Sequence, residues 1–279
     1  MLLGGQQKIM KNKKIREERQ KEAQRVLKLS QKFQSLVDTA FDNTDYIASP
    51  LNYTSEFKIS GVNHHVKDNN KHKKDIIKFT DDDTITSLRK AKEKYEDDEI
   101  KNFCILNFAS YKKPGGGFLN GSKSQEEDIC MSSFLYPVLE RFKSVYKYRK
   151  KRGGEYGHDL FYSKNMPILN KEKTMREFDV DVISCSAPNR GVMKKNGIVD
   201  GYIAKVLTNR IEAIFKIAIA HNVDCLILGA FGTGVFKNND YTVAATFDMM
   251  CEKYHRFFKK IIFAIPDKNK LKTFKGVIL

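Results

Sequence analysis

The sequence lacks every stretch that would mark a membrane-embedded or secreted chain. No apolar run approaches the roughly 20 residues of a membrane span, and the first ten residues lack the apolar stretch of about 7 to 15 residues of a signal peptide. The five cysteines stand far apart, never form a Cys-x-x-Cys pair, and mostly lie in apolar runs such as FCILNF. We therefore expect buried, reduced thiols in a soluble intracellular protein, cytoplasmic or, in a eukaryotic or viral setting, nuclear, with no membrane partner.

Acidic residues are scarce relative to basic ones. Asp and Glu total 34 against 50 Lys and Arg, which gives the 279-residue chain a net charge of +16. Such an excess favours a polyanionic partner. The basic residues concentrate in residues 1–35 and in the run Lys143 to Arg152, which contains no acid. The second run is typical either of a solvated helix end or of a stripe that contacts nucleic acid or another polyanion.

After Ile100 the sequence alternates apolar runs with helical patterns. The runs FCILNF, VDVIS, CLILGA and IIFAI are short and nearly continuously apolar, as is typical of strands buried on both faces. Between them, residues 201–222 and 242–258 place apolar side chains at helical spacing. The alternation predicts an α/β sandwich with helices on both faces and with ligand-binding loops at the carboxyl ends of the strands.

The first hundred residues have a different character. Residues 15–37 have the pattern of an amphipathic helix with a basic outer face, and the polar segment 46–98 suggests loops, short strands and a helix over 87–98. We expect residues 1–99 to be a basic helix and an accessory segment packed on a core of residues 100–279, together forming one structural unit. His64, His65 and His72 lie in a polar stretch without nearby cysteines, so no metal site is expected.

A triple glycine, Gly115 to Gly117, follows the expected strand that ends near Phe108. Consecutive glycines let the backbone approach a ligand closely and turn its amides inward, as phosphate or sugar recognition requires. A helix is expected to begin near Ser124. The tetrapeptide Ser124 to Glu127 alone is equally explained by a capping box, in which the Ser124 hydroxyl bonds the amide of Glu127 and the Glu127 carboxylate reaches back.

The start of a helix also affects how Glu127 titrates. The helix dipole lowers a carboxyl pKa, which opposes a role as general acid. Burial, the neighbouring Glu126 or a bound diphosphate would raise that pKa again.

A second glycine loop, LILGAFGTGVFKNND, again follows an apolar strand. Its glycines Gly229, Gly232 and Gly234 fit neither a Walker loop nor Gly-x-Gly-x-x-Gly, which disfavours a mononucleotide kinase and a Rossmann oxidoreductase. Its backbone amides are nevertheless suited to hold a diphosphate, with Thr233 adding a hydroxyl and Phe236 an apolar wall for a sugar ring. A tight turn with a core phenylalanine is the alternative.

Together these residues resemble the macrodomain-type poly(ADP-ribose) glycohydrolases, most closely their microbial branch. The signature of that family is a triple glycine, a short spacer and Gln-Glu-Glu, which Gly115 to Gly117 and Gln125-Glu126-Glu127 match. GAFGTGVFKN resembles the family's diphosphate-binding loop. The likeness covers roughly residues 15–279 and implies a three-layer α/β/α macrodomain-like sandwich with a mixed sheet and an N-terminal helical extension.

The resemblance implies a role for each matching residue. Glu127 would protonate the leaving oxygen of the ribose–ribose bond and then deprotonate the attacking water, Glu126 would hold the ribose hydroxyls, and Gln125 would orient the pair. Asn107 is a further candidate ribose contact. The expected contacts of the distal ribose, the diphosphate and the terminal ribose are Gly115, Gly116, Gly117, Gly232, Thr233, Gly234, Val235 and Phe236. The family implies no metal and no cofactor.

We therefore expect a glycoside hydrolase that cleaves poly(ADP-ribose). The expected partner is poly(ADP-ribose) or an ADP-ribosylated macromolecule, with contact between nucleic acid and the basic segments as a further hypothesis. The alternatives are a hydrolase for single ADP-ribose units on protein or nucleic acid, a non-catalytic ADP-ribose reader, and a basic nucleic-acid-binding protein. A reader would have no chemical need for Glu126 and Glu127, which favours an enzyme.

Overall fold

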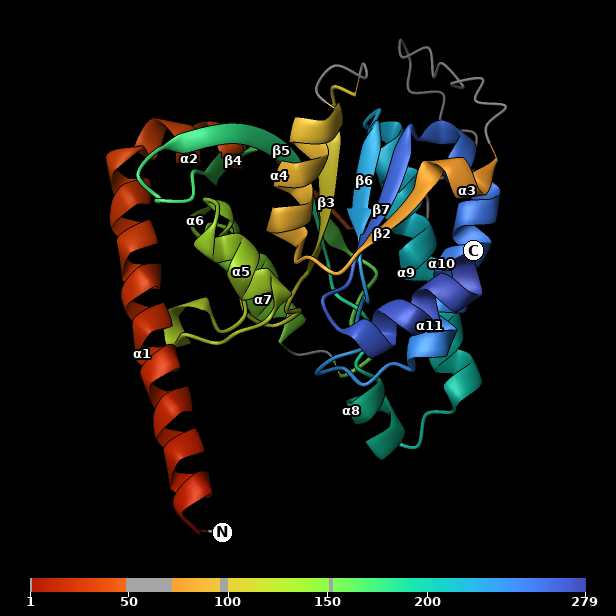
Figure 1. Ribbon diagram of the computed structural model, residues 1–279, viewed down its shortest axis with the longest axis horizontal. Helices are drawn as coiled ribbons and strands as arrows, with labels where there is room; N and C mark the ends of the chain where they lie inside the picture. Colours follow the sequence, from red (N-terminus) through yellow and green to blue (C-terminus); the bar gives the residue numbers. More distant parts are fainter. Residues whose placement is uncertain (1, 49–71, 96–99, 151–152) are drawn as a thin grey trace.

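A single seven-stranded sheet forms the centre of the protein in the computed structural model, which describes residues 2–48, 72–95, 100–150 and 153–279 (Figure 1). Along the sheet the strands follow the order β1-β4-β5-β3-β6-β7-β2. The strands are β1 (Thr44–Ile47), β2 (Ile77–Thr80), β3 (Phe103–Phe108), β4 (Leu160–Leu169), β5 (Arg176–Cys185), β6 (Cys225–Leu228) and β7 (Lys260–Ala264).

The sheet is mixed. β5, β3, β6, β7 and β2 run parallel to one another, whereas β4 is antiparallel to β5 and to β1. β6 is buried at every position, and β3 at all but its last, which explains their continuous apolar sequences. Because β1 and β2 precede residue 100, the first part of the chain supplies both edges of the sheet.

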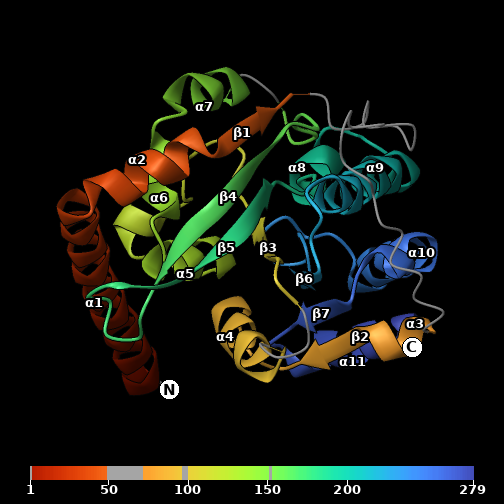
Figure 2. The ribbon, with the colours of Figure 1, turned by 90° about the horizontal axis from the view of Figure 1, so that it is seen from above.

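Helices cover both faces of the sheet (Figure 2). One apolar core lies between the sheet and the pair α9 and α10, with α11 beside them, through Leu207, Phe247 and Phe274. The other core lies under α1, α2, α4, α5 and α6 and includes Val26, Leu88 and Ile129. The three-layer α/β/α sandwich predicted from the sequence is thus confirmed.

The helices of the described residues vary from single turns to 31 residues. They are α1 (Leu2–Lys32), α2 (Gln34–Asp42), α3 (Lys73–Ile76), α4 (Thr84–Tyr95), η2 (Phe118–Asn120), α5 (Gln125–Met131), α6 (Leu135–Glu140), α7 (Lys143–Arg149), α8 (Arg190–Lys195), α9 (Asp200–Ala220), α10 (Asp240–Tyr254), η3 (His255–Phe257) and α11 (Lys268–Ile278).

The expected N-terminal helix is present but longer than predicted, and it is interrupted. It begins at Leu2 rather than near Ile15, and the non-helical backbone of Phe33 separates α1 from α2. Ala23 and Val26 of α1 are fully buried, whereas every residue from Lys8 to Glu18 is exposed. The helix therefore packs on the body with its C-terminal half and extends beyond it with its N-terminal half (Figure 1).

Two expectations about composition can be compared with the described residues. All five cysteines are buried and free, as predicted. Among the described helices, none has the length and apolarity needed to cross a membrane. His64 and His65 lie outside the described residues.

Candidate active site

The two predicted glycine loops meet at the carboxyl ends of β3 and β6. They line a cavity of about 430 Å³, which we call the glutamate cavity. Its walls include Phe108 at the end of β3, Ser110 just beyond it, the start of α5, and the loop after β6. The sequence-predicted residues that line it are Gly116, Gly117, Gln125, Glu126, Glu127, Gly232, Gly234, Val235 and Phe236. Gly115, Asn107 and Thr233 are not among its lining residues.

The triple glycine brings backbone against both carboxylates. Gly116 has a left-handed φ of +59°, and a Cβ atom there would lie 2.5 Å from Glu127 Oε1 and 2.9 Å from Glu126 Oε2. Gly115 has the same φ and would clash with the Tyr136 ring. Glycine is required at these two positions because other residues both avoid this conformation and lack the space.

Glu127 is buried and held at both carboxylate oxygens. Gly117 N–H donates to Oε1 at 2.7 Å, and the Ser124 hydroxyl donates to Oε2. Ser124 is the N-cap residue of α5, as predicted, but its side chain makes no capping bond to the backbone. The bonds of the predicted capping box are therefore wrong. The Ser124 hydroxyl donates to the Glu127 carboxylate rather than accepting the amide of Glu127, and the carboxylate accepts the amide of Gly117.

Glu126 lies deeper, with an exposed fraction of 3%. Ser110 N–H donates to its Oε2 at 2.8 Å, and Asn107 Nδ2 lies 3.5 Å from its Oε1. Burial, with a smaller contribution from the Glu127 carboxylate, raises the pKa of Glu126 from 4.5 to about 8, although the Ser110 amide opposes the shift. At neutral pH the pair therefore contains one carboxyl group that is mostly neutral.

Gln125 connects α5 to the end of β3. Its Oε1 accepts the amide of Phe108 at 2.8 Å, and its Nε2 donates to the carbonyl of Leu106 at 2.6 Å and to the Thr84 hydroxyl at 3.1 Å. These bonds continue the backbone pattern where the strand ends. They fix the first turn of the helix that carries both glutamates.

The second loop is shaped by a buried asparagine. Gly232 has φ +71°, and a Cβ there would lie 2.3 Å from the Ala187 side chain. Asn238 Nδ2 donates to the carbonyls of Gly232 and Pro188, which closes the loop. Val235 at its tip is 82% exposed. The loop is thus anchored at its base and open to solvent at its tip.

Thr233 does not face the glutamate cavity. It lines a neighbouring cavity of about 510 Å³, the lysine cavity, where Lys270 of α11 donates to its hydroxyl at 2.8 Å. The Thr233 hydroxyl donates in turn to the carbonyl of Ala230 at 3.0 Å. The two cavities share Phe108, Ser124, Gln125, Ala230 and Gly234.

The ring of Phe236 is held by a tyrosine that the sequence did not reveal. Tyr156 packs edge-on against Phe236 with ring centroids 5.8 Å apart, and it stacks on Tyr111 at 4.4 Å. Tyr156 has a positive φ of 63°, which is strained for a non-glycine residue. Tyr111 in turn contacts Asp159, which pairs with the buried Arg149.

The N-terminal helix also reaches the glutamate cavity. Arg16 lines the cavity and donates through Nε to the carbonyl of Asn120 at 2.7 Å. Arg19 donates to the carbonyl of Ser122 and pairs with Asp128, the residue after Glu127, at 2.8 Å. These contacts hold the segment between the triple glycine and α5.

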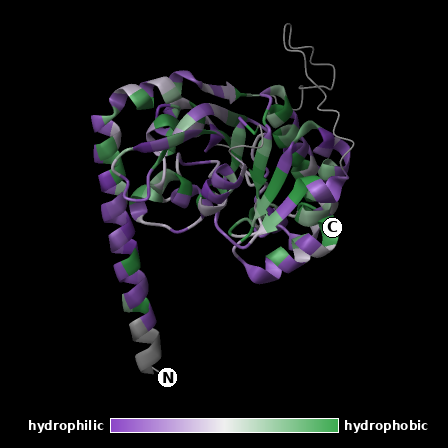
Figure 3. Cartoon of the chain, turned by 45° about the horizontal axis from the view of Figure 1, so that its top comes forward, coloured by the Kyte–Doolittle hydropathy of each residue, from purple (hydrophilic) through white to green (hydrophobic). Residues whose placement is uncertain are grey.

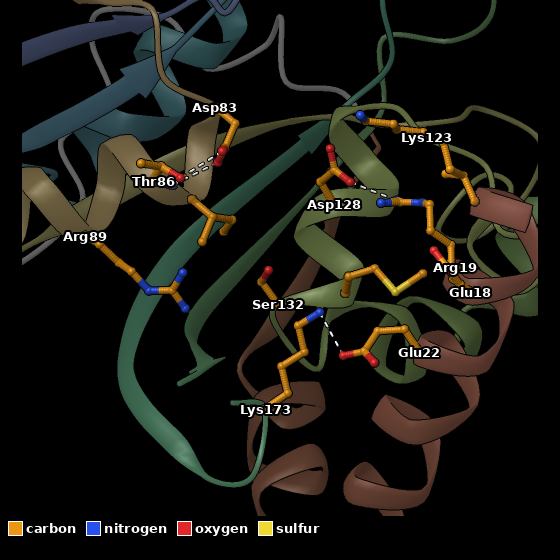
Figure 4. A pocket seen from close by; sticks show the side chains of 13 residues that line it. Glu18, Arg19, Glu22, Asp83, Thr86, Arg89, Lys123, Asp128, Ser132 and Lys173 are labelled. Carbon is orange, nitrogen blue, oxygen red and sulfur yellow. Dashed lines mark hydrogen bonds and ion pairs between the residues drawn. The ribbon is translucent and has the colours of Figure 1, made fainter. Parts of the chain in front are cut away.

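A third cavity, the side cleft, separates α1 from α4 and α5 (Figure 4). Its volume is about 570 Å³, and it joins the lysine cavity through Asp83, Ile85, Lys123 and Asp128. Acids and bases line it in equal measure, and Lys173 pairs across it with Glu22 at 2.9 Å. It contains neither Glu126 nor Glu127.

Sequence reasoning missed the residues that come from distant segments. Arg16, Tyr156 and Lys270 carry no motif. Only the fold brings Arg16 and Lys270 to the two cavities and Tyr156 to the Phe236 ring. The basic run before Glu17 was the one signal that pointed toward Arg16. Of the basic run 143–152, Arg149 is buried against Asp159, so that run is not a continuous exposed stripe.

This arrangement is suited to acid–base chemistry on a ligand that carries a diphosphate. It combines two adjacent carboxyl groups, one of them neutral, with two loops that present backbone amides. Among the described residues, no group of three or more His, Cys, Asp or Glu has the arrangement of a metal site.

Comparisons with known proteins agree with this chemistry. The family model described as "Microbial-type PARG, catalytic domain" matches residues 12–171. The poly(ADP-ribose) glycohydrolase from Thermomonospora curvata, bound to the inhibitor ADP-HPD, is similar in fold with a TM-score of 0.77 and 24% identity over 94% of this chain and 99% of that one.

A second solved structure is similar over a smaller part of the chain. The poly(ADP-ribose) glycohydrolase from Deinococcus radiodurans in complex with ADP-ribose has a TM-score of 0.70 and 24% identity, over 87% of this chain and 96% of that one. No curated protein matches the sequence at a significant level.

Proposed function

This chain belongs to the microbial-type PARG family, and on that premise we propose that it hydrolyses the ribose–ribose O-glycosidic bond of poly(ADP-ribose) with Glu127 as the acid and base. The observation that carries the proposal is the carboxylate of Glu127, fixed by Gly117 N–H and the Ser124 hydroxyl at the wall of the glutamate cavity. A carboxyl group fixed in this way is presented to the scissile bond in the same geometry at each turnover.

Glu127 acts twice in the proposed reaction. Its proton passes to the oxygen that leaves the anomeric carbon as the carbon–oxygen bond breaks, and the carbon becomes oxocarbenium-like. The resulting carboxylate then takes a proton from the water whose oxygen attacks that carbon, which restores the protonated acid. The products are a free ADP-ribose unit and a chain shortened by that unit.

Glu126 supports this cycle by remaining neutral. With its pKa raised to about 8, it adds little negative charge beside Glu127 and can donate a hydrogen bond to a ribose hydroxyl as well as accept one. Asn107 is fully buried beneath Glu126, so we assign it to positioning that carboxyl group rather than to contact with the ribose. Gln125 positions the pair by fixing α5 on β3.

The glycine loops supply recognition of the ADP-ribose unit. We assign the amides of Gly232, Gly234, Val235 and Phe236 to the diphosphate and the Phe236 ring to the terminal ribose. The amide of Thr233 is not among them, because it donates to the carbonyl of Ala230. Gly115 to Gly117 approach the distal ribose, since a side chain at Gly116 would occupy the space beside both carboxylates. Thr233 is assigned to supporting this loop through Lys270 rather than to the ligand.

The experiment that tests this function compares two substrates. Wild type and Glu127→Gln are incubated with poly(ADP-ribose) and with mono-ADP-ribosylated protein, and the released ADP-ribose is measured. We expect release from the polymer by wild type and at least a hundredfold slower release by the variant, because general acid–base catalysis contributes about 10² to 10⁴ in rate. If wild type and variant both bind ADP-ribose but release only equal background amounts, the protein is a non-catalytic ADP-ribose reader instead.

Contact with nucleic acid through the basic segments is a separate hypothesis. The two segments differ in accessibility, because the lysines of α1 between residues 8 and 14 are exposed whereas Arg149 of the second run is buried. Lys143, Lys147 and Lys150 of the second segment are exposed as well, but only the first segment belongs to a helix, α1, that also supplies a lining residue of the glutamate cavity, Arg16.

A further inference from the structure

The N-terminal half of α1 presents a basic surface that the proposed reaction does not use. Between residues 8 and 16 the helix carries five basic residues and no acid, and all of them are exposed. Figure 3 shows that the coloured part of this half of the helix is mainly hydrophilic. The five residues are Lys8, Lys11, Lys13, Lys14 and Arg16.

These charges are not neutralised within the described chain. The four lysines make no ion pair with any described residue, whereas Arg16 is fixed by its bond to the carbonyl of Asn120. Lys8 and Lys11 are three residues apart, as are Lys11 and Lys14, so like charges adjoin on the helix surface. A polyanion lying along the helix would relieve this repulsion.

The basic surface begins at the glutamate cavity. Arg16 bonds Asn120, the Gly117 backbone lies against Ser122, and Gly117 N–H bonds Glu127, so a short chain of contacts connects α1 to the proposed acid. The loop around Phe236 makes its contacts elsewhere, with Tyr156. Since the proposed function assigns the terminal unit to the Phe236 loop, the leaving side of the scissile bond is assigned to the opposite wall of the cavity, which Arg16 of α1 lines.

The direction of the helix extends this surface away from the cavity. From Arg16 to Lys8 the axis continues for about 12 Å at the rise of an α-helix. It projects at the end of the molecule where β3, β6 and β7 end (Figure 1).

Helical spacing separates the lysines into two pairs. Lys13 lies one turn and Lys8 about two turns before Arg16, on the half of the helix surface that also carries the body-facing Ala23. Lys11 and Lys14 lie on the opposite half. Only the first pair shares this half of the helix with Arg16, which lines the glutamate cavity.

We propose that Lys8 and Lys13, together with Arg16, form a docking face for the part of the poly(ADP-ribose) chain on the leaving side of the cleaved bond. This inference rests on the proposed function. Each repeat of that chain carries a diphosphate, which exposed lysines bind through charge. The amides of the loop after β6 hold the terminal unit, and the docking face holds the rest of the polymer after each cleavage.

The test compares two pairs of lysines on the same helix. In the Glu127→Gln background, Lys8→Gln with Lys13→Gln is measured against the matched control Lys11→Gln with Lys14→Gln, which removes the same charge. We expect the first pair to weaken binding of long poly(ADP-ribose) about fivefold and to reduce its salt dependence, and the second pair to weaken it less than about twofold. Affinity for free ADP-ribose stays unchanged in both.

Three results would overturn the docking face. The first is an equal loss of affinity in both pairs, or no loss in either, because the orientation of the lysines would then be irrelevant. The second is single-stranded RNA of equal charge competing as well as the polymer, which would make nucleic acid the occupant. The third is a lower melting temperature of the Lys8→Gln, Lys13→Gln variant alone, which would show that these lysines stabilise the folded protein.

The docking face and the proposed function fail separately. If folded wild type releases no ADP-ribose from the polymer, the proposed reaction is wrong. The comparison of polymer affinity between the two lysine pairs still decides the docking face. If wild type releases ADP-ribose and the two pairs bind alike, the reaction stands and the docking face does not.

Discussion

At the scale of single residues, Gly116 determines whether the two carboxyl groups can occupy their positions. A Cβ at Gly116 would lie within 3 Å of oxygens from both Glu126 and Glu127, at a φ of +59°. We expect Gly116→Ala to lower kcat about hundredfold, because displacing a catalytic group by about 1 Å has an effect of that size. Steady-state rates on poly(ADP-ribose) measure it.

The matched control for this prediction is Gly276→Ala in α11. A Cβ there meets nothing within 4 Å, and Gly276 lies on a helix where alanine is favoured. We expect its rate to equal that of wild type. If Gly116→Ala were as active as Gly276→Ala, the glycine loop would not constrain the glutamates.

The neutral state of Glu126 links stability to pH. Because its pKa is raised from 4.5 to about 8 on folding, the folded protein holds a proton there that the unfolded chain releases across this range. The free energy of unfolding contributed by this proton is therefore complete below pH 4.5 and is lost as pH rises toward 8. We expect wild type to lose stability relative to Glu126→Gln as the pH rises through this window.

Urea unfolding of both proteins at several pH values measures this difference. Glutamine keeps the shape of the neutral carboxyl group and an oxygen that accepts the Ser110 amide. Because glutamine does not titrate, the stability of the Glu126→Gln variant lacks this pH-dependent contribution. A constant difference between the two proteins from pH 4.5 to 8 would show that Glu126 titrates as an ordinary carboxyl group.

At the scale of elements, α1 is fastened to the helix that carries the glutamates. Arg19 makes an ion pair with Asp128 and a bond to the carbonyl of Ser122, both partly buried. We expect Arg19→Ala to lower the free energy of unfolding by about 1 to 2 kcal/mol, since a partly buried pair and one charged hydrogen bond are lost. Chemical unfolding measures it.

A lysine on the same helix provides the control for Arg19. Lys14 is exposed and makes no ion pair with a described residue, so Lys14→Ala should change stability by less than about 0.5 kcal/mol. If the two variants were equally stable, the contact between α1 and α5 would not hold the helix on the body.

Sequence reasoning succeeded best with elements whose burial is uniform. β3 was predicted at its observed bounds because FCILNF is apolar on both faces. β4 was missed, since it contains Lys164, Asn165 and Pro167, and the left-handed backbone of Asn165 interrupts its register with β5. The first half of α1 was missed because an exposed helix has no apolar period.

At the scale of the whole molecule, the site could be predicted only in part. The glycine loops and the Gln-Glu-Glu segment are local, so the sequence reveals them. Arg16 and Lys270 reach the two cavities, and Tyr156 reaches the Phe236 ring, from three other segments, and no spacing rule predicts which loops a mixed sheet brings together. The bond from Ser110 N–H to Glu126 is missed for a related reason, because a backbone amide has no sequence signal.

The contribution of the first hundred residues to the sheet and to one apolar core predicts which truncated chains still fold. Residues 100–279 alone would lack β1 and β2, the two edges of the sheet, and also Val26, Leu88 and their neighbours, which fill one of the two apolar cores. We therefore expect this shorter chain to lose cooperative unfolding and to bind a hydrophobic dye, because buried apolar surface becomes exposed. Removal of residues 2–14 should leave cooperative unfolding intact, since residues 8–14 are exposed. A cooperative thermal transition of residues 100–279 would instead show that the core folds without the first part of the chain.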